Sequence, residues 1–200
     1  YEIAQCLVGS EMCIRDSIKG GRDLRFSVVR YGNVMGSRGS VIPFFMNRRS
    51  TGVLPITHEE MTRFNISLQA GVDLVMFAIG HHLGGEIFIP KIPSYKIVDV
   101  AKAIAPDAKI EIVGIRPGEK LHEEMITPTD AMNTIDLGAY YAILPSVSDR
   151  YTREDFIKYH NATPVPENFH YSSDKNTEWE TVESMREKIK KFVDPNFEIE

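Results

Sequence analysis

Short apolar segments with the character of β-strands alternate with helix-like segments through most of this chain, and no other feature constrains its fold as strongly. Strand-like segments stand at residues 25–30, 52–57, 86–90 and 109–113. Apolar residues with helical spacing lie between them, at 41–46, 67–83 and 97–104. Strands that alternate with helices favour parallel pairing, because the helix carries the chain back to the end of the sheet where the next strand begins. The sequence therefore predicts an α/β fold.

Two of these helices have apolar stripes that predict which side is buried. The helix that begins at Ser67 should end at Gly84, since glycine favours helix C-termini. Its expected buried face is Leu68, Val72, Val75, Ile79 and Leu83. The stripe of the next helix is Ile97, Val100, Ala101 and Ile104, and it stops before Pro106.

The last 50 residues, 151–200, are more polar and aromatic than the rest. Thr177 and Glu180 have the spacing of a capping box, in which the two side chains satisfy free backbone donors at the start of a helix. An apolar stripe follows at Val182, Met185, Ile189 and Phe192. We therefore expect a small helical extension at this end.

The overall composition is ordinary for a soluble globular protein, with 42% hydrophobic and 26% charged residues. A net charge of −5 argues against a nucleic-acid partner, which would require a basic surface. No apolar run approaches the roughly 20 residues that span a bilayer, and the N-terminus lacks the charged and apolar segments of a signal peptide. We expect a cytoplasmic location and no membrane partner.

Both cysteines, Cys6 and Cys13, lie in an N-terminal segment of unusual sequence. Residues 11–16, EMCIRD, resemble one reading frame of a transposon-type sequencing adaptor, so we interpret residues 1–17 as a suspect segment. The alternative is a genuine helix of variable sequence. On the first interpretation the cysteines carry no information about redox state or metal binding.

The first candidate site follows the strand at 25–30, where a glycine-rich turn runs from Gly32 to Gly39. Ligands of open parallel sheets bind beyond the carboxyl ends of the strands. Asn33 offers hydrogen-bond donors and an acceptor, and Arg38 offers a fork of donors that matches phosphate. The alternative is a strand-to-helix turn that needs glycine for its geometry alone.

Two further arginines are candidates for holding a phosphorylated ligand. Arg63 has apolar neighbours, so we expect partial burial and a counter-charge, which a diphosphate would supply. Arg116 follows a strand and can clamp a phosphate with two parallel bonds, while the carboxylate of Glu119 can accept bonds from sugar hydroxyls. The alternatives are a solvated surface arginine at 63 and a polar turn leading into a helix at 119–125.

Three histidines invite a metal interpretation that their spacing does not support. His81 and His82 are adjacent, so they point in different directions from a helix. Neither they nor His122 have a carboxylate at a compelling ligand spacing. We expect no metal site.

The candidate sites occur in a specific order along the chain. The segments are FSVVRYGNV (26–34), GSVIPFF (39–45), LPIT with MTRF (54–64), GEIFIPKIP (85–93) and GIRPGEKLHE (114–123), followed by FHYSS and NTEW (169–179). This series resembles the C-terminal half of the inverting UDP-N-acetylglucosamine 4,6-dehydratases. The resemblance covers nearly the whole chain from Ile18 onward.

The resemblance implies an extended short-chain dehydrogenase fold with a Rossmann-like sheet. Residues 18–150 would be the remainder of that sheet and the UDP-sugar-binding region, and 151–200 the helical extension. The implied cofactor is NADP, the substrate is UDP-N-acetylglucosamine, and the protein would form a homo-oligomer. The implied reaction removes water from the sugar and inverts C5. It is the first step toward pseudaminic acid, which is used to glycosylate flagellin and other surface structures.

The same resemblance implies a role for each matching site residue. Tyr31, Gly32 and Val34 would line the NADP site. The substrate would be held by Asn33, Arg38, Val41, Thr57, Arg63, Arg116 and Glu119. Within this set, the arginines at 63 and 116 would neutralise the diphosphate.

The catalytic residues of the family have no counterpart in this sequence. The glycine-rich NADP loop and the Tyr-x-x-x-Lys pair are absent, and Tyr1 is followed four residues later by Gln5. We therefore expect a fragment that lacks dehydratase activity and folds poorly. The alternatives are a related UDP-sugar epimerase or retaining dehydratase, and a nucleotide-sugar-binding module without catalysis.

Overall fold

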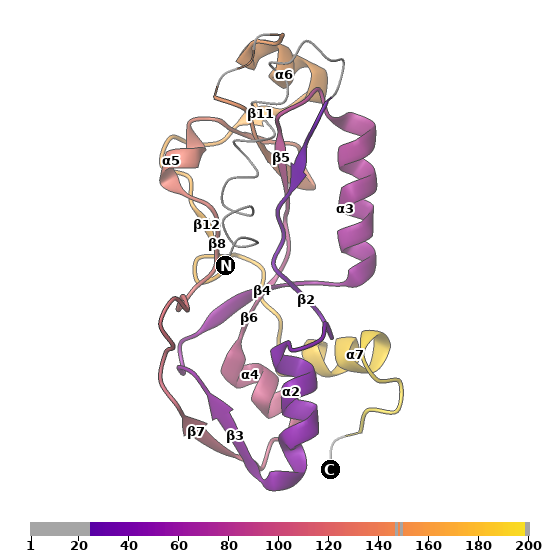
Figure 1. Cartoon of the computed structure of the whole chain (residues 1–200), viewed down its shortest axis with the longest axis vertical. Helices are drawn as coiled ribbons and strands as arrows, with labels where there is room; N and C mark the ends of the chain where they lie inside the picture. The colour runs from indigo at the N-terminus through magenta and orange to yellow at the C-terminus, as the bar shows by residue number, and fades with distance from the viewer. Residues whose placement is uncertain (1–24, 147, 149, 199–200) are drawn as a thin grey trace. The chain divides into compact units, whose positions relative to one another are not determined.

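The computed structural model describes residues 25–146, 148 and 150–198, and they form two units (Figure 1). Unit 1 holds the described residues up to Arg30 together with 72–91 and 126–169. Unit 2 holds 31–71, 92–125 and the described residues from His170 onward. The segment expected to form a C-terminal extension therefore contributes to both units. The suspect segment 1–17 lies outside the described residues.

Unit 1 is built on a five-stranded sheet with the strand order β1-β5-β10-β9-β11. β1 and β5 are parallel, with Val28 opposite Ile87, whereas the other neighbours are antiparallel. The strands are β1 (Val28–Val29), β5 (Ile87–Pro90), β9 (Thr134–Asp136), β10 (Tyr140–Ile143) and β11 (Thr163–Pro164), and the accompanying helices are α3 (Leu68–His81), α5 (Pro128–Ala131) and α6 (Arg153–His160). The predicted strands at 25–30 and 86–90 are confirmed as a parallel pair, although β1 is shorter than expected.

Helix α3 buries a different side from the one its sequence predicts. Leu74 and Ala78 are buried and pack in one core with Phe88 of β5. The expected core residues other than Leu83 are exposed instead, with exposed fractions of 70% for Leu68, 47% for Val72, 38% for Val75 and 63% for Ile79. The prediction was wrong because α3 carries apolar residues around most of its circumference, so their spacing alone does not select a side.

Unit 2 contains three small sheets and three longer helices. In the first sheet β4 lies between β2, which is parallel to it, and β6, which is antiparallel. β3 pairs with β7 in parallel, and β8 pairs with β12. The strands are β2 (Asn33–Val34), β3 (Val53–Ile56), β4 (Thr62–Ile66), β6 (Ser94–Lys96), β7 (Lys109–Ile112), most of β8 (Glu124–Ile126) and β12 (Tyr171–Ser172), and the helices are α2 (Val41–Arg48), η2 (Arg49–Thr51), α4 (Ile97–Ile104) and α7 (Val182–Phe192). Together with β1–β5, these parallel pairs confirm the predicted α/β class.

Helix α4 packs against both α2 and α7 and forms with them the main core of unit 2 (Figure 1). Phe45 of α2, Val100 of α4 and Ile189 of α7 are each almost completely buried. Burying a large apolar side chain of this kind contributes about 1.5–3 kcal/mol. The predicted stripe of α4 is confirmed, since all four of its residues are buried.

Helix α7 begins four residues later than the sequence predicts. Its N-cap is Thr181, whose hydroxyl accepts a bond from the N–H of Ser184 at 3.1 Å, while the Ser184 hydroxyl accepts one from the N–H of Thr181. The capping box predicted at Thr177 and Glu180 is therefore wrong. The buried carboxylate of Glu180 instead pairs with Lys188 and accepts a bond from the Ser184 hydroxyl.

Candidate functional site

A cleft of about 710 Å³ lies entirely among residues of unit 2. It is formed mainly by the turn after β2 with the start of α2, by the end of β3 with β4, and by residues 113–119. Nine of the ten residues predicted to bind substrate or cofactor line it, namely Gly32, Asn33, Val34, Arg38, Val41, Thr57, Arg63, Arg116 and Glu119. Tyr31 is absent from its lining and is 43% exposed. The volume falls within the usual range of small-molecule sites.

The glycine-rich turn is held in place by the pairing of β2 with β4. Asn33 lies opposite Asn65 in this parallel pair. A Cβ atom added at Gly32 would lie 2.5 Å from the Cβ of Phe64, so glycine is required there by strand packing. Gly39 has a φ of +76° and open space around it, so its requirement is conformational. The glycines thus shape the turn, and close approach of a ligand is not needed to explain either.

Asn33 is oriented by a buried tyrosine that the sequence analysis missed. Its Nδ2 donates to the hydroxyl of Tyr95 at 3.3 Å, and Tyr95 is 2% exposed. Burial raises the pKa of Tyr95 to about 12, so its hydroxyl remains neutral at physiological pH. Because the amide nitrogen is held by Tyr95, the amide oxygen of Asn33 is left for the cleft.

Arg63 lines the cleft, but its guanidinium is already occupied by protein groups. Nη1 donates to the carbonyl oxygens of Thr62 (2.7 Å) and Leu121 (3.0 Å). Nη2 donates to the carbonyl oxygen of Lys120 (2.9 Å) and to the sulfur of Met61 (3.2 Å). The side chain is only 11% exposed, which confirms the partial burial expected from its apolar neighbours.

The counter-charges of Arg63 come from two carboxylates of this chain. Glu119 lies 3.9 Å from Nη2 and Glu123 lies 3.8 Å from Nε. Glu123 also accepts a bond from the backbone N–H of Phe64 at 2.9 Å. Burial raises the pKa of Glu123, although this N–H and Arg63 both act against that rise. The counter-charge expected for Arg63 is therefore present within the chain, so its partial burial does not by itself require a bound diphosphate.

Arg116 differs from Arg63 in being exposed and free. Its side chain makes no hydrogen bond or ion pair with any described residue. Its backbone N–H donates to the carboxylate of Glu119 at 3.3 Å, and its carbonyl oxygen accepts a bond from the N–H of Glu119 at 3.0 Å. Arg38, which follows Asn33 later in the same glycine-rich turn, is likewise exposed. The cleft thus presents two cations whose donors are available to an anionic ligand.

The segment after Arg116 is not the helix that was considered as an alternative. Residues 119–123 have no regular structure and lead into the strand β8. Glu123, inside this segment, was treated as a solvated residue and proves to be mostly buried. Neither Glu123 nor Tyr95 carried a local signal, because their burial comes from strand pairing between distant segments.

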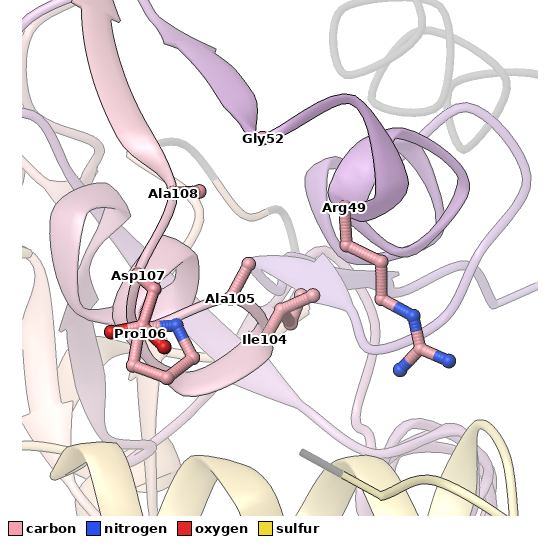
Figure 2. Close-up of a pocket in the computed structure, with 7 residues that line it drawn as sticks. All are labelled: Arg49, Gly52, Ile104, Ala105, Pro106, Asp107 and Ala108. Carbon is pink, nitrogen blue, oxygen red and sulfur yellow. The ribbon is translucent and has the colours of Figure 1, made fainter. Parts of the chain in front are cut away.

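A second, smaller cavity of about 150 Å³ lies beside the end of α4 (Figure 2). It contains none of the predicted site residues. Its two charged side chains, Arg49 and Asp107, lie on opposite sides of it in Figure 2. Arg49 also donates to the carbonyl oxygen of Glu198 at 3.0 Å. Because no polar groups converge on a common point, this cavity is a poor candidate for a functional site.

Comparison with known families decides which kind of protein carries this cleft. Residues 6–145 match the model of a family described as polysaccharide biosynthesis protein. The chain belongs to this family. The match covers the turn, the arginines and Glu119, and therefore all the predicted site residues.

Individual proteins and one solved structure are also similar to this chain. The chain is 48% identical to the UDP-N-acetylglucosamine 4,6-dehydratase (inverting) of Campylobacter jejuni, over 87% of this chain and 54% of that protein. It is also 46% identical to the UDP-glucose 4-epimerase of Rickettsia akari, over 58% of this chain and 36% of that enzyme. The solved structure of Pen from Bacillus thuringiensis matches 91% of this chain and 55% of Pen, with a TM-score of 0.77 and 31% identity. The chain therefore spans about half the length of the dehydratase relative and a smaller share of the epimerase relative.

The described residues lack two further features. They contain no group of three or more histidine, cysteine, aspartate or glutamate side chains placed to hold a metal ion. None of their helices has both the length and the apolar character needed to cross a membrane.

Proposed function

We propose that this chain is the UDP-sugar-binding part of a UDP-N-acetylglucosamine 4,6-dehydratase of the inverting type. The parent protein, meaning the full-length protein of which the chain is a part, would carry the activity. One observation carries the proposal: three separate segments bring the residues of the family pattern into one cleft of suitable size. The 48% identity to the Campylobacter jejuni dehydratase supports the choice of reaction.

Each side of the cleft offers groups suited to one part of a UDP-sugar. Arg116 and Arg38 have free guanidinium groups, which match the charge and geometry of a diphosphate. Glu119 is an acceptor for sugar or ribose hydroxyls, and the amide oxygen of Asn33 is a second. Val41 and Thr57 supply the border of the cleft. The arrangement therefore binds and orients a nucleotide sugar, whereas the residues that move protons belong to the rest of the parent protein.

NADP is the proposed cofactor, on the basis of the resemblance. When bound, it would supply reversible hydride transfer, taking hydride from C4 of the sugar and returning it at C6. Gly32 and Val34 border the cleft, and Tyr31 directly precedes Gly32 in the chain. The proposal assigns all three residues to the nicotinamide end of the cofactor. The chain's own contribution is to hold the sugar still while a ketone at C4 acidifies the proton at C5. We further propose a cytoplasmic homo-oligomeric enzyme at the first step toward pseudaminic acid and flagellin glycosylation.

The proposal is tested with the purified parent protein in two measurements. Calorimetric titration with UDP should show binding that is lost when the diphosphate is replaced by uridine. Incubation with UDP-N-acetylglucosamine should give a product lighter by one water, with inverted configuration at C5 by NMR. A parent protein that binds neither UDP nor its sugar conjugate would overturn the proposal. UDP binding without turnover of either UDP-N-acetylglucosamine or UDP-glucose would leave the non-catalytic binding module as the answer.

A UDP-sugar 4-epimerase is the second candidate, since the Rickettsia akari relative carries that name. Epimerisation also requires a bound UDP-sugar and a hydride that leaves C4 and returns, so the same cleft would serve it. The two reactions differ in the mass of the product. An epimerase would convert UDP-glucose to an isomer of equal mass and would not dehydrate UDP-N-acetylglucosamine.

A further inference from the structure

The donors of Arg63 leave little capacity for a ligand. A guanidinium has five N–H groups. Four of these have acceptors within the protein, which are the carbonyl oxygens of Thr62, Leu121 and Lys120 and the sulfur of Met61. The fifth, on Nε, faces Glu123 at 3.8 Å. A phosphate could contact Arg63 only by displacing these groups and approaching two carboxylates.

The partners of Arg63 are concentrated in one segment of the cleft wall. Lys120, Leu121 and the two carboxylates of Glu119 and Glu123 all belong to residues 116–123. This segment has no helix or strand of its own before β8 begins. Arg63, by contrast, lies on β4, which is paired on both sides by other strands. Arg63 therefore connects this irregular segment to β4, a strand that is paired on both sides.

Other bonds from β4 fix only the later part of the segment. The N–H of Thr62 donates to the carbonyl oxygen of Leu121 at 3.2 Å, and its hydroxyl is 2.8 Å from His122. The N–H of Phe64 donates to Glu123. Residues 113–118, which carry Arg116, are all exposed. Among the described side chains of β4, Arg63 is the one that contacts Lys120 and Glu119. These are the partners that lie nearest to Arg116 in the sequence.

We infer that Arg63 is a positioning residue that holds residues 116–123 so that Arg116 and Glu119 face the cleft, and that it does not bind the ligand's phosphates itself. The inference rests on the proposed function, because it concerns how the same cleft binds UDP. It assigns the diphosphate contact to Arg116 and Arg38. It also explains why Arg63 has its charge balanced inside the protein, as a structural arginine requires.

The first test needs no ligand and uses the parent protein. Arg63→Gln should increase hydrogen exchange at the backbone amides of Arg116 and Glu119 by roughly tenfold or more. These N–H groups donate to the carboxylate of Glu119 and to the carbonyl oxygen of Arg116, and the substitution removes the contacts of Arg63 with Glu119 and Lys120 that hold this turn. Arg186→Gln is the matched control, since Arg186 also donates to two carbonyl oxygens, those of Ala103 and Lys102, at 3.1 and 3.2 Å. The control should leave exchange at the amides of Arg116 and Glu119 unchanged. Unchanged exchange in Arg63→Gln would overturn the inference.

The second test is a double-mutant cycle for UDP binding. Arg63→Gln should weaken UDP binding by about tenfold in the otherwise unchanged parent and by less than about twofold when Arg116→Ala and Glu119→Ala are already present. An equal loss in both backgrounds would mean that Arg63 contacts the phosphates directly. Should Arg63→Gln fail to fold, Arg63→Lys serves in both tests, because it keeps the charge but has three donors in place of five. Absence of UDP binding in the unmutated parent would refute the proposed function, while the exchange test would still decide the role of Arg63.

Discussion

The two sides of the cleft are built in opposite ways. On the β4 side, Phe64 is fully buried, and Arg63 has all its Nη donors bound by the protein. On the 113–119 side, the residues are mostly exposed, and Arg116 has a free guanidinium. An arginine whose donors all have protein partners stabilises the fold but has no donor left for a ligand. An arginine with free donors can bind an anionic ligand, and replacing it costs the fold little stability. We therefore expect substitutions on the β4 side to change mainly stability, and substitutions on the 113–119 side to change mainly binding.

The largest expected effect is on stability and comes from the β4 side. Phe64→Ala should lower the free energy of unfolding of the parent protein by about 3–5 kcal/mol, because a fully buried phenyl ring leaves a cavity next to Tyr171. Denaturant titration followed by fluorescence measures this. Phe192→Ala is the control, since Phe192 is 44% exposed, and it should cost much less. Equal losses of unfolding free energy in the two variants would contradict the expectation that the β4 side contributes mainly to stability.

The next effect is on binding and comes from the opposite side. Arg116→Ala should weaken UDP binding by about 2–5 kcal/mol while leaving the free energy of unfolding nearly unchanged, because its guanidinium has no described partner to lose. Calorimetric titration and denaturant unfolding measure the two quantities. Lys120→Ala is the control, since Lys120 is an exposed cation of the same segment whose side chain does not line the cleft. An unchanged dissociation constant for Arg116→Ala would remove this residue from the site.

The same contrast explains how far the sequence could predict the site. Residues proposed to bind through exposed side chains, such as Arg116 and Arg38, are recognised from their types and from the family pattern. Tyr95 and Glu123 were missed because they act through partners about 60 residues away, Asn33 and the backbone of Phe64. No local spacing encodes such pairs. Arg63 shows the intermediate case, since its burial was predicted but its partners were not.

The fold shows a similar division between α4 and α3. The stripe of α4 lies on one side of a short helix, and all four of its predicted residues are buried. Helix α3 is apolar around most of its surface, so the predicted side was the exposed one, and Leu74 and Ala78 form the core instead. Periodicity predicts a helix in both cases. It predicts the buried side only when the other side is polar.

A smaller effect on binding is expected from Tyr95, which belongs to the buried side but supports a cleft residue. Tyr95→Phe removes the hydroxyl that accepts a bond from Asn33 at 3.3 Å. The amide then loses its fixed orientation, and UDP-N-acetylglucosamine should bind more weakly by about 0.5–1.5 kcal/mol. Asn33→Ala should abolish this sensitivity, so that adding Tyr95→Phe to it changes nothing further. Full affinity in Tyr95→Phe would mean that the amide is held by the ligand alone.

The smallest expected effect is a dependence of stability on pH that differs in sign between two carboxylates, the partly buried Glu123 and the fully buried Glu86. Burial raises the pKa of Glu123, so the folded state holds this proton more tightly than the unfolded state. The stabilisation that Glu123 contributes is therefore fully present at pH values below the ordinary pKa of glutamate. It is lost as the pH rises through the raised pKa of the folded state. Burial also acts to raise the pKa of Glu86, but hydrogen bonds from His160 and from the backbone N–H groups of Leu83 and Gly84 outweigh it, and the pKa is lowered.

Glu86 in unit 1 should consequently behave in the opposite way. Its contribution is present above the ordinary glutamate range and is lost as pH falls through the lowered pKa. Unfolding free energies of the parent protein, Glu123→Gln and Glu86→Gln, measured from about pH 3 to about pH 8, test both signs. Relative to the unmutated protein, Glu123→Gln should gain stability as pH rises, and the deficit of Glu86→Gln should shrink as pH falls. If both variants changed in the same direction, one of the two carboxylates would not be held as the structure describes. The contact between Glu123 and Arg63 would be the first to re-examine. A tight ion pair at that contact would lower the pKa of Glu123 instead of raising it.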